Sequence, residues 1–336
     1  MEASVEMIKN DDEALETVLI TGGAGYIGSN LANRLAAARK KVLVIDNLYS
    51  GLIENLTEQV FFIEGNVGNK ALLQKIFSEN EIQTVFHFAA RKSVPESTEK
   101  PRLYMKENVE NTRILLEVMN EHNCTALVFA STAAVYGDRE VTKEGYAESD
   151  TPLPTNPYGL SKLLAEQRII DATKCSSLRA ISFRFFNVGM SESLMNPYMG
   201  EDLLSVLTDC YLSSKVFEIF GNDYPTLDGT CYRDFIHISD LLDALELSQD
   251  FLKLTPDQFT VFNLGSGNGI SLGQVATLGS QILGERFSYE YSARRPGDIP
   301  YSLANISLSR NTLNWHPKFS PQVLFSLFFE KLKAAQ

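Results

Sequence analysis

The sequence is poor in the residues that cross-link small proteins or bind metals. Its 336 residues include four cysteines, four histidines and one tryptophan. The cysteines are scattered and form no C-x-x-C pair, so we expect reduced thiols, no disulfide framework and no zinc site. The histidines add no metal-binding pattern.

Long apolar runs and an excess of positive charge are also missing. No apolar stretch reaches the roughly 18 residues of a membrane-spanning helix, and residues 1–16 lack the basic start and apolar block of a signal peptide. The chain carries 42 acidic and 30 basic residues, and its net charge of −12 argues against a nucleic-acid or membrane partner. We predict a cytoplasmic protein with a disordered acidic tail over residues 1–16.

What the chain does contain is a regular alternation of apolar strand patterns and helical patterns. The alternation predicts right-handed βαβ units and a doubly wound, mostly parallel α/β sheet that binds ligands at the carboxyl ends of its strands. The predicted strands are Val18–Ile20, Val42–Ile45, Val60–Ile63, Val85–Phe88, Ala126–Ala130 and Ala180–Phe185. The predicted helices are Ile27–Arg39, Lys70–Glu79, Tyr104–His122, Tyr158–Thr173 and, near the C-terminus, Pro321–Lys333.

A glycine-rich turn links the first predicted strand to the first predicted helix. Gly22, Gly25 and Gly28 are spaced G-x-x-G-x-x-G, which permits a tight turn and lets a pyrophosphate approach the backbone at a helix N-terminus. The second strand ends in Asp46, whose carboxylate would accept hydrogen bonds from a ribose 2'-hydroxyl and repel a 2'-phosphate. We therefore predict NAD rather than NADP as the cofactor.

A second motif follows the fifth strand. Tyr158 and Lys162 are spaced i and i+4 and would share one helix face. A lysine ammonium beside the phenol would lower the tyrosine pKa toward working pH, as a tyrosine base requires, and Thr132 could share a hydrogen bond with the hydroxyl being deprotonated. An ordinary helical pair is the alternative, and the glycine turn upstream favours the catalytic interpretation.

The sequence leaves the roles of two further residues open. Lys92, after the fourth strand, could reach a phosphate or hydroxyl, or it could be a solvated lysine on a packed turn. Asn66, after the third strand, could bind an adenine edge or cap the helix that begins near Asn69.

Together, the motifs T-G-G-A-G-Y-I-G-S, Y-G-L-S-K, G-N-D-Y-P-T, R-D-F-I-H and R-P-G-D resemble those of the UDP-glucose 4-epimerase family, which lies within the extended short-chain dehydrogenase/reductase superfamily. The resemblance runs from about Thr17 to the C-terminus. It implies a Rossmann-type NAD-binding domain over residues 17–186 and a smaller UDP-sugar domain over 187–336, with segments near 233–265 returning to the large domain. The chain departs from the family pattern at Asn66, after Val188, and at Glu201 and Asp202.

The resemblance also implies roles for individual residues. The catalytic residues would be Thr132, Tyr158 and Lys162. The NAD-binding residues would be Gly22, Gly25, Tyr26, Ile27, Gly28, Asp46, Asn47, Asn66, Val67, Phe88, Ala89, Ala90, Lys92, Asn108, Tyr158, Lys162 and Phe186. The substrate-binding residues would be Lys92, Thr132, Tyr158, Asn187, Arg233, Arg295, Asp298 and Ser302. Arg233 and Arg295 suit bidentate diphosphate contacts, with surface ion pairs to Asp234 and Asp298 as the alternative.

The activity that the resemblance implies is interconversion of UDP-glucose and UDP-galactose by transient oxidation at C4 with bound NAD. A 4,6-dehydratase would need acidic residues after Thr132, where Ala133 and Ala134 stand. A UDP-glucuronate 4-epimerase or decarboxylase, and a non-catalytic NAD-binding sensor, remain alternatives. Small Ser302 favours entry of UDP-GlcNAc and UDP-GalNAc as well, unless Tyr301 closes the space. A homodimer through the helices over 104–122 and 158–173 is expected, although their apolar faces could equally be core.

Overall fold

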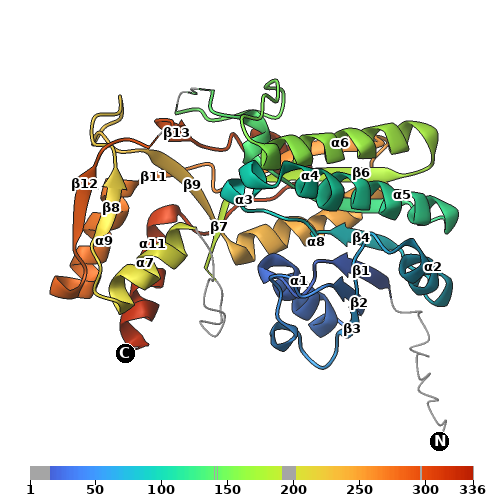
Figure 1. Cartoon of the computed structure of the whole chain (residues 1–336). Coiled ribbons are helices and arrows are strands. Elements are labelled where there is room, and N and C mark those ends of the chain that lie inside the picture. Colours follow the sequence, from blue (N-terminus) through green and yellow to red (C-terminus); the bar gives the residue numbers. More distant parts are fainter. Residues whose placement is uncertain (1–15, 140, 142, 191–201, 296, 336) are drawn as a thin grey trace, which may run out of the picture.

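Seven parallel strands form the central sheet of the computed structural model, which describes residues 16–139, 141, 143–190, 202–295 and 297–335 (Figure 1). Their order is β10-β6-β5-β4-β1-β2-β3, and every neighbouring pair is parallel. The strands are β1 (Thr17–Thr21), β2 (Lys41–Asp46), β3 (Phe61–Glu64), β4 (Thr84–His87), β5 (Ala126–Thr132), β6 (Arg179–Phe185) and β10 (Phe259–Leu264). The sheet confirms the predicted fold class.

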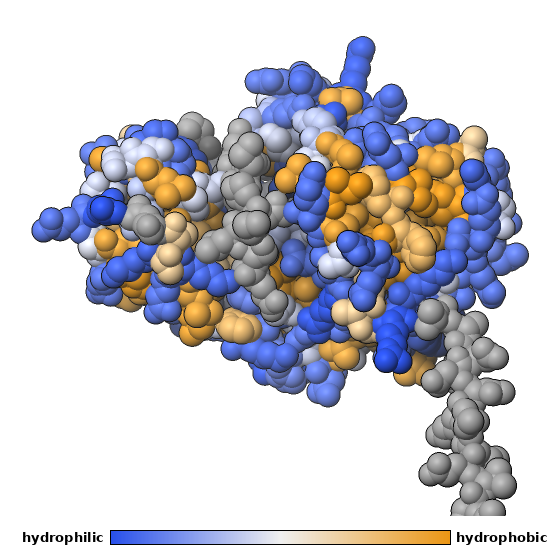
Figure 2. Space-filling model, turned by 90° about the horizontal axis from the view of Figure 1, so that it is seen from below, coloured by the Kyte–Doolittle hydropathy of each residue, from blue (hydrophilic) through white to orange (hydrophobic). Residues whose placement is uncertain are grey.

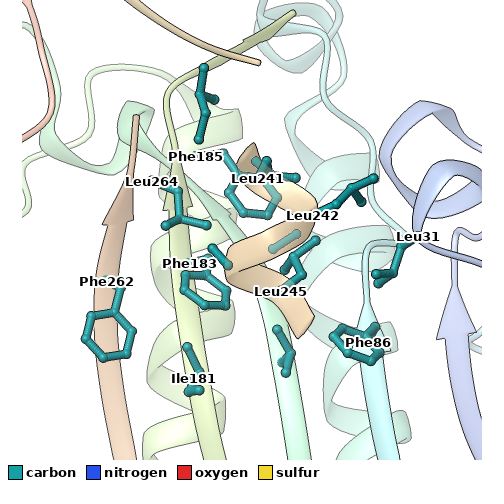
Figure 3. Packing of buried hydrophobic residues seen from close by; sticks show 14 of the residues in the cluster. Leu31, Phe86, Ile181, Phe183, Phe185, Leu241, Leu242, Leu245, Phe262 and Leu264 are labelled. Atoms are coloured by element: carbon teal, nitrogen blue, oxygen red, sulfur yellow. The ribbon is translucent and has the colours of Figure 1, made fainter. Parts of the chain in front are cut away.

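Helices cover both faces of this sheet because alternate strand residues point to opposite sides. In β1, Val18 and Ile20 join one apolar cluster and Leu19 joins another. The first cluster lies under α1 (Tyr26–Ala37) and α8 (Ile238–Leu254), and Figure 3 shows leucines of α8 packed against β6 and β10. The opposite face is covered by α2 (Lys70–Glu79), α5 (Asn111–Glu121) and α6 (Pro157–Cys175).

The helix predicted over 104–122 is assembled from three pieces. A short helix α4 (Pro101–Tyr104) runs into a π-helical turn over Met105–Glu110, which continues into α5. The π turn carries Asn108, and such turns occur often at functional sites. The preceding helix α3 (Val94–Glu99) was not predicted; Ser93 caps its N-terminus by accepting a hydrogen bond from the backbone of Glu96.

The second half of the chain builds a smaller set of sheets beside the large one. One sheet joins β7 (Asn187–Gly189), β9 (Tyr232–His237), β11 (Gly269–Ser271) and β13 (Tyr301–Ser302), and another pairs β8 (Phe217–Phe220) with β12 (Tyr289–Ser292). The helices of this half are α7 (Leu203–Leu212), α9 (Leu272–Leu283), α10 (Ser307–Leu313) and α11 (Pro321–Ala334). Its apolar cluster joins α7, α9 and α11 to β8.

The sequence also predicts the state of the chain ends and a domain boundary. Glu16, expected in a loose tail, accepts a hydrogen bond from the Lys40 ammonium (2.8 Å), while residues 1–15 lie outside the described part of the chain. In α11, Val323 is exposed, while Phe325 and Phe329 pack inward. The division into two domains at residue 186 stays a prediction.

Hydrophobic side chains are exposed in a group on one face of the half that holds the seven-stranded sheet (Figure 2). Within the described part of the chain, none of the helices combines the length and apolar composition that crossing a membrane requires.

Candidate functional site

A cleft of about 600 Å³ opens at the carboxyl ends of the central strands. Its walls come from the segments that follow β1, β2, β3 and β4, from the end of β5 and from the start of α6. This is the edge at which doubly wound parallel sheets bind ligands.

The glycine turn forms one end of the cleft. Gly22 has a φ of +69°, and a Cβ built on it would lie 2.6 Å from the backbone nitrogen of Ala89. A Cβ on Gly28 would lie 2.5 Å from the Gly22 carbonyl oxygen. Both positions therefore require glycine, the first because of its backbone conformation and the second because the helix and the turn approach closely.

The N-terminus of α1 at this turn suits an anionic ligand. Gly25 is its N-cap and offers no side-chain hydrogen bond, and the first turn carries no acidic residue. The first amides of the helix and its dipole are thus not neutralised by the helix's own side chains. The residues present fit the diphosphate of a dinucleotide.

Asp46 ends β2 at the floor of the cleft. One carboxylate oxygen accepts the amide hydrogen of Ala24 (3.0 Å) and the other accepts that of Leu48 (2.8 Å). These bonds fix the carboxylate and leave lone pairs on both oxygens for ribose hydroxyls. The geometry fits the ribose contact expected of Asp46.

Nearly all the residues expected to hold the cofactor line this one cleft. They are Gly22, Gly25, Tyr26, Ile27, Gly28, Asp46, Asn47, Asn66, Val67, Phe88, Ala89, Ala90, Lys92, Tyr158 and Lys162. The structure also adds lining residues that sequence reasoning missed, among them Tyr49, Arg91, Ser131 and Phe185.

Asn108 and Phe186 are not among the residues that line the cleft, and their contact with the cofactor stays a prediction. The Asn108 amide group is used within the protein: it accepts from the backbone of Arg91 (2.8 Å) and donates to the Arg91 carbonyl and to the Ser161 hydroxyl (both 2.9 Å). Asn108 therefore positions the wall at Arg91. Phe186 is buried in the core beyond the end of β6, and Phe185 lines the cleft in its place.

Asn66 lines the cleft but does not cap the following helix. Its side-chain oxygen accepts from the backbone of Gly68 (2.7 Å), and its amide donates to Glu107 (3.1 Å). The N-cap of α2 is Asn69, which accepts from Leu72 (3.2 Å). The capping interpretation of Asn66 is wrong because the next turn of chain supplies its own cap.

Thr132 and Tyr158 meet at the end of β5. Thr132 lies close enough to Tyr158 to affect its pKa, and its side chain accepts a hydrogen bond from the backbone of Ala134 (3.2 Å). Burial raises the pKa of Tyr158, and Thr132 acts to lower it. The structure therefore brings these two side chains together.

Lys162 lies one turn further along α6, with its ammonium turned to the strand. The ammonium donates to the Ala130 carbonyl (2.8 Å) and lies 4.9 Å from the Phe129 ring centroid. Burial lowers the pKa of Lys162 to about 7, while the charge of Glu166 acts to raise it. The effect of Lys162 on the Tyr158 phenol stays a prediction.

A buried ion pair supports α6 behind Lys162. Arg184 donates to both oxygens of Glu166 (3.2 and 2.8 Å), and Ser182 donates to one of them (3.0 Å). Both charged side chains are almost fully buried, so each depends on the other. Sequence reasoning missed this pair because its members lie on different elements.

Sequence reasoning also missed His87, at the end of β4. Its two ring nitrogens lie 2.6 Å from the Thr21 hydroxyl and 2.8 Å from the Thr112 hydroxyl. Burial, with the nearby charge of Lys162, lowers the pKa of His87 to about 3. His87 is therefore a neutral structural link between β1, β4 and α5.

Ser131 offers an unused polar group to the cleft. Its side chain is buried, and its hydroxyl has no hydrogen-bond partner among the described residues. It lies between Ala130, which binds the Lys162 ammonium, and Thr132. A buried hydroxyl without a partner costs stability, so this one fits a site that receives a polar ligand.

Five of the expected substrate-binding residues lie in or beside the smaller sheet and do not line this cleft: Asn187, Arg233, Arg295, Asp298 and Ser302. Asp298 pairs with the Arg233 guanidinium (3.1 Å) and with that of Arg295 (3.2 Å). Ser302 is in register with Arg233 across β13 and β9. The alternative, in which these arginines form ion pairs with acidic residues, is therefore seen for Asp298. It is not seen for Asp234, which is buried and bonded to Ser266.

The strand register separates Ser302 from its neighbour Tyr301. Paired residues of parallel strands point to the same side, and successive residues to opposite sides. Ser302 therefore faces the Arg233 side, while Tyr301 packs against Tyr232, with ring centroids 5.4 Å apart. The register therefore places Tyr301 on the side of the strand opposite to Ser302. Asn187 joins the same sheet by donating to the Asp234 carbonyl (2.9 Å).

Asp202, a departure from the family pattern, has a structural role. It is the N-cap of α7 and accepts from the Ser205 backbone (3.1 Å) and hydroxyl (3.0 Å). It also lines the cleft. Glu201 and the rearranged loop expected after Val188 lie largely or wholly outside the described residues.

An all-parallel sheet with a glycine turn opening into its ligand cleft defines a dinucleotide-binding α/β protein. Residues 18–265 match the model of the NAD dependent epimerase/dehydratase family. A curated UDP-glucose 4-epimerase of Halalkalibacterium halodurans is 37% identical over 309 residues, covering 90% of this chain and 91% of the relative. This chain belongs to the NAD dependent epimerase/dehydratase family.

Solved structures are similar over almost the whole chain. UDP-glucose 4-epimerase from Brucella ovis in complex with NAD is 30% identical, with a TM-score of 0.86. The alignment covers 95% of this chain and 98% of the Brucella ovis chain. The UDP-Glc/GlcNAc 4-epimerase from Campylobacter jejuni has a TM-score of 0.83 at 31% identity, with coverage of 96% and 100%.

Proposed function

We propose that this protein is a UDP-hexose 4-epimerase that interconverts UDP-glucose and UDP-galactose with NAD bound in the cleft. The observation that carries the proposal is that Tyr158 and Lys162 line the same cleft as the glycine turn, with Thr132 close to Tyr158. The similarity to UDP-glucose 4-epimerases along the chain supports it.

In this proposal the cleft holds the cofactor from end to end. The turn at Gly22 and the N-terminus of α1 would hold the diphosphate, Asp46 the adenosine ribose, and Lys92, Tyr158 and Lys162 the nicotinamide half. The chemistry that bound NAD supplies is a hydride acceptor and donor at C4 of the sugar.

The chain's own residues would then move the proton. Tyr158, as the phenolate, would take the proton of the sugar 4-hydroxyl and later return it, and Thr132 would hold that hydroxyl in line. The Lys162 ammonium favours the phenolate because a positive charge nearby stabilises the anion. The ammonium has three N–H donors and uses one on the Ala130 carbonyl, so the others are available to the phenolate or a ribose hydroxyl.

Binding of the UDP-sugar would use the small sheet. Arg233 and Arg295 share Asp298 in this structure, and the diphosphate would compete with that carboxylate for the two guanidinium groups. We place the boundary between the NAD domain and the UDP-sugar domain at residues 186 and 187, with β10 returning to the large sheet.

Turnover assays on the purified protein test this function. UDP-glucose, UDP-galactose, their 2-acetamido analogues and UDP-glucuronate are incubated separately, and the products are resolved by chromatography. We expect the two hexoses to interconvert. Turnover of UDP-glucuronate alone would replace the proposal with the uronate alternative, and tight NAD binding without turnover of any sugar would favour a sensor.

A second substrate pair, UDP-GlcNAc and UDP-GalNAc, is favoured by the Ser302 side of β13. Small Ser302 is on the Arg233 side while Tyr301 points to the other side, so the bulky tyrosine ring is not where a 2-acetamido group would lie in this proposal. The structural neighbour from Campylobacter jejuni is described as acting on both Glc and GlcNAc.

We also propose that the protein is a cytoplasmic homodimer that pairs through α5 and α6. Leu160 and Leu164 lie one turn apart on α6, and both are about two-fifths exposed. Light scattering after gel filtration should give the mass of a dimer, and Leu164→Arg should shift it toward that of a monomer. A wild-type monomer would contradict this proposal.

A further inference from the structure

We propose that Tyr49 and Arg91 form a bridge across the mouth of the dinucleotide cleft that slows release of the cofactor. The inference rests on the proposed function, because it takes NAD to occupy this cleft. Both side chains line the cleft, Tyr49 from the loop after β2 and Arg91 from the loop after β4.

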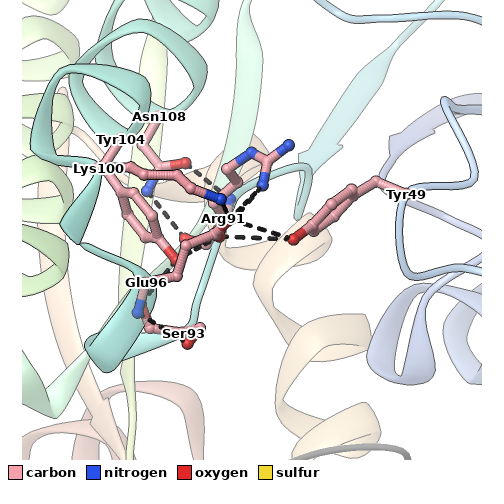
Figure 4. A network of polar contacts seen from close by, with 7 residues as sticks. All are labelled: Tyr49, Arg91, Ser93, Glu96, Lys100, Tyr104 and Asn108. Carbon is pink, nitrogen blue, oxygen red and sulfur yellow. Dashed lines mark hydrogen bonds and ion pairs between the residues drawn. The ribbon is translucent and has the colours of Figure 1, made fainter. Parts of the chain in front are cut away.

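The Arg91 wall of the bridge is rigid (Figure 4). Asn108 accepts from the backbone nitrogen of Arg91 and donates to its carbonyl, so the main chain is fixed on both sides. The guanidinium donates to both oxygens of Glu96 (3.1 Å each). Glu96 is held in turn by the buried Tyr104, whose hydroxyl donates to it (3.1 Å).

Tyr49 lies on the other side of the cleft mouth and follows a residue with a strained backbone. Leu48 has a φ of +56°, a conformation that is unfavourable for a leucine, and its amide is tied to Asp46 (2.8 Å). This turn carries Tyr49 out over the cleft. Strain at a loop residue is expected where the position of the next side chain matters.

The two walls meet through the tyrosine ring. The Arg91 guanidinium carbon lies 3.8 Å from the centroid of the Tyr49 ring, and the Tyr49 hydroxyl lies 3.5 Å from each oxygen of Glu96. The first contact is a cation–π interaction; the second is a long hydrogen bond. The ring therefore supplies most of the attraction.

The position of the bridge relates it to the cofactor. Tyr49 lies three residues after Asp46 in the sequence. Arg91 lies two residues after Ala89, and the backbone of Ala89 lies close to the turn at Gly22. The bridge thus spans the segment between the proposed ribose and diphosphate sites. Tyr49 is 58% exposed and contacts the other wall only through its ring and hydroxyl, so it is the part that swings away when a ligand passes.

The test measures release of NAD directly. Protein loaded with radiolabelled NAD is mixed with excess unlabelled NAD, and retained label is counted over time. Tyr49→Ala should speed release about threefold to tenfold, because it removes the ring, whereas Tyr49→Phe keeps the ring and should change release less than about twofold. Tyr291→Ala, which removes a half-exposed tyrosine on β12 away from the cleft, is the matched control and should release at the wild-type rate.

The double variant Tyr49→Ala/Arg91→Met separates a bridge from two independent contacts. A bridge predicts that the double variant releases NAD no faster than the faster of the two single variants. Effects that multiply, or a Tyr49→Ala rate equal to wild type, would overturn the bridge while leaving NAD binding and the proposed function intact. A wild type that binds no NAD would instead overturn the proposed function.

Discussion

The ammonium of Lys162 donates to the carbonyl of Ala130 at 2.8 Å, on the strand whose last residue, Thr132, lies beside Tyr158. The lysine is therefore fixed by the sheet rather than by the phenol. Burial lowers the pKa of Lys162 to about 7, which places its charge change within the working range of an enzyme.

The free energy of unfolding should increase as the pH rises, because the buried Lys162 loses its proton more readily in the folded protein than in the unfolded chain. The pKa of about 7 lies below the usual value of 10.5, so between these values the unfolded chain binds more protons than the folded one. Relative to Lys162→Met, the wild-type free energy of unfolding should rise by about 2 kcal/mol from pH 7.5 to 9.5. Urea titrations of both proteins measure this difference. A constant difference would show that Lys162 titrates normally.

Replacing the proposed base should remove catalysis but not the fold. Tyr158→Phe deletes the hydroxyl beside Thr132, and we expect kcat to fall about 10²- to 10⁴-fold. Steady-state kinetics with UDP-galactose measures the loss, and a melting temperature close to wild type provides the control. Full activity in this variant would remove Tyr158 from the mechanism.

The glycine turn should not accept a side chain. Gly22→Ala places a Cβ 2.6 Å from the backbone of Ala89 at a φ of +69°, so we expect loss of NAD binding and marked destabilisation. Gly284→Ala is the matched control, because its φ is +71° but no atom lies within 4 Å, so it tests backbone strain without crowding and should cost about 1–3 kcal/mol. Calorimetric titration with NAD and thermal melts compare the two; equal effects would mean that the crowding at Gly22 is unimportant.

Removing one member of the buried Arg184–Glu166 ion pair should destabilise the fold more than removing both members. Arg184→Met leaves the Glu166 carboxylate buried without its partner and should destabilise the fold by about 3–5 kcal/mol. Arg184→Met/Glu166→Leu removes both charges and should recover most of that loss. Denaturant unfolding of both variants measures the difference, and a double variant as unstable as the single one would contradict this account.

The size of residue 302 should select the sugar. Ser302→Tyr fills the Arg233 side of β13, and we expect kcat/KM for UDP-GlcNAc to fall about 100-fold with little change for UDP-glucose. Parallel assays with both substrates test this. A wild type without activity on UDP-GlcNAc would refute the prediction at once.

Local patterns carried most of the fold prediction. The six predicted strands and the helices over 27–39, 70–79 and 158–173 all appear with shifts of one or two residues at most of their ends, because each pattern reports directly which side of an element is buried. Short α3 and the π turn at Asn108 were missed, since neither has a periodic apolar pattern long enough to detect.

The sequence by itself determined the parts of the site that one segment can specify. These are the glycine turn, the carboxylate at the end of β2, and Tyr158 and Lys162 on one helix, because spacing along the chain sets their relative positions.

Only the tertiary structure decided which groups from separate elements meet. It turned the Lys162 ammonium to Ala130, placed Asn108 behind the wall at Arg91, paired Glu166 with Arg184 and joined Arg233 and Arg295 at Asp298. Contacts of this kind depend on how helices pack on the sheet and on the strand register, and neither is written in the spacing of residues along a single segment.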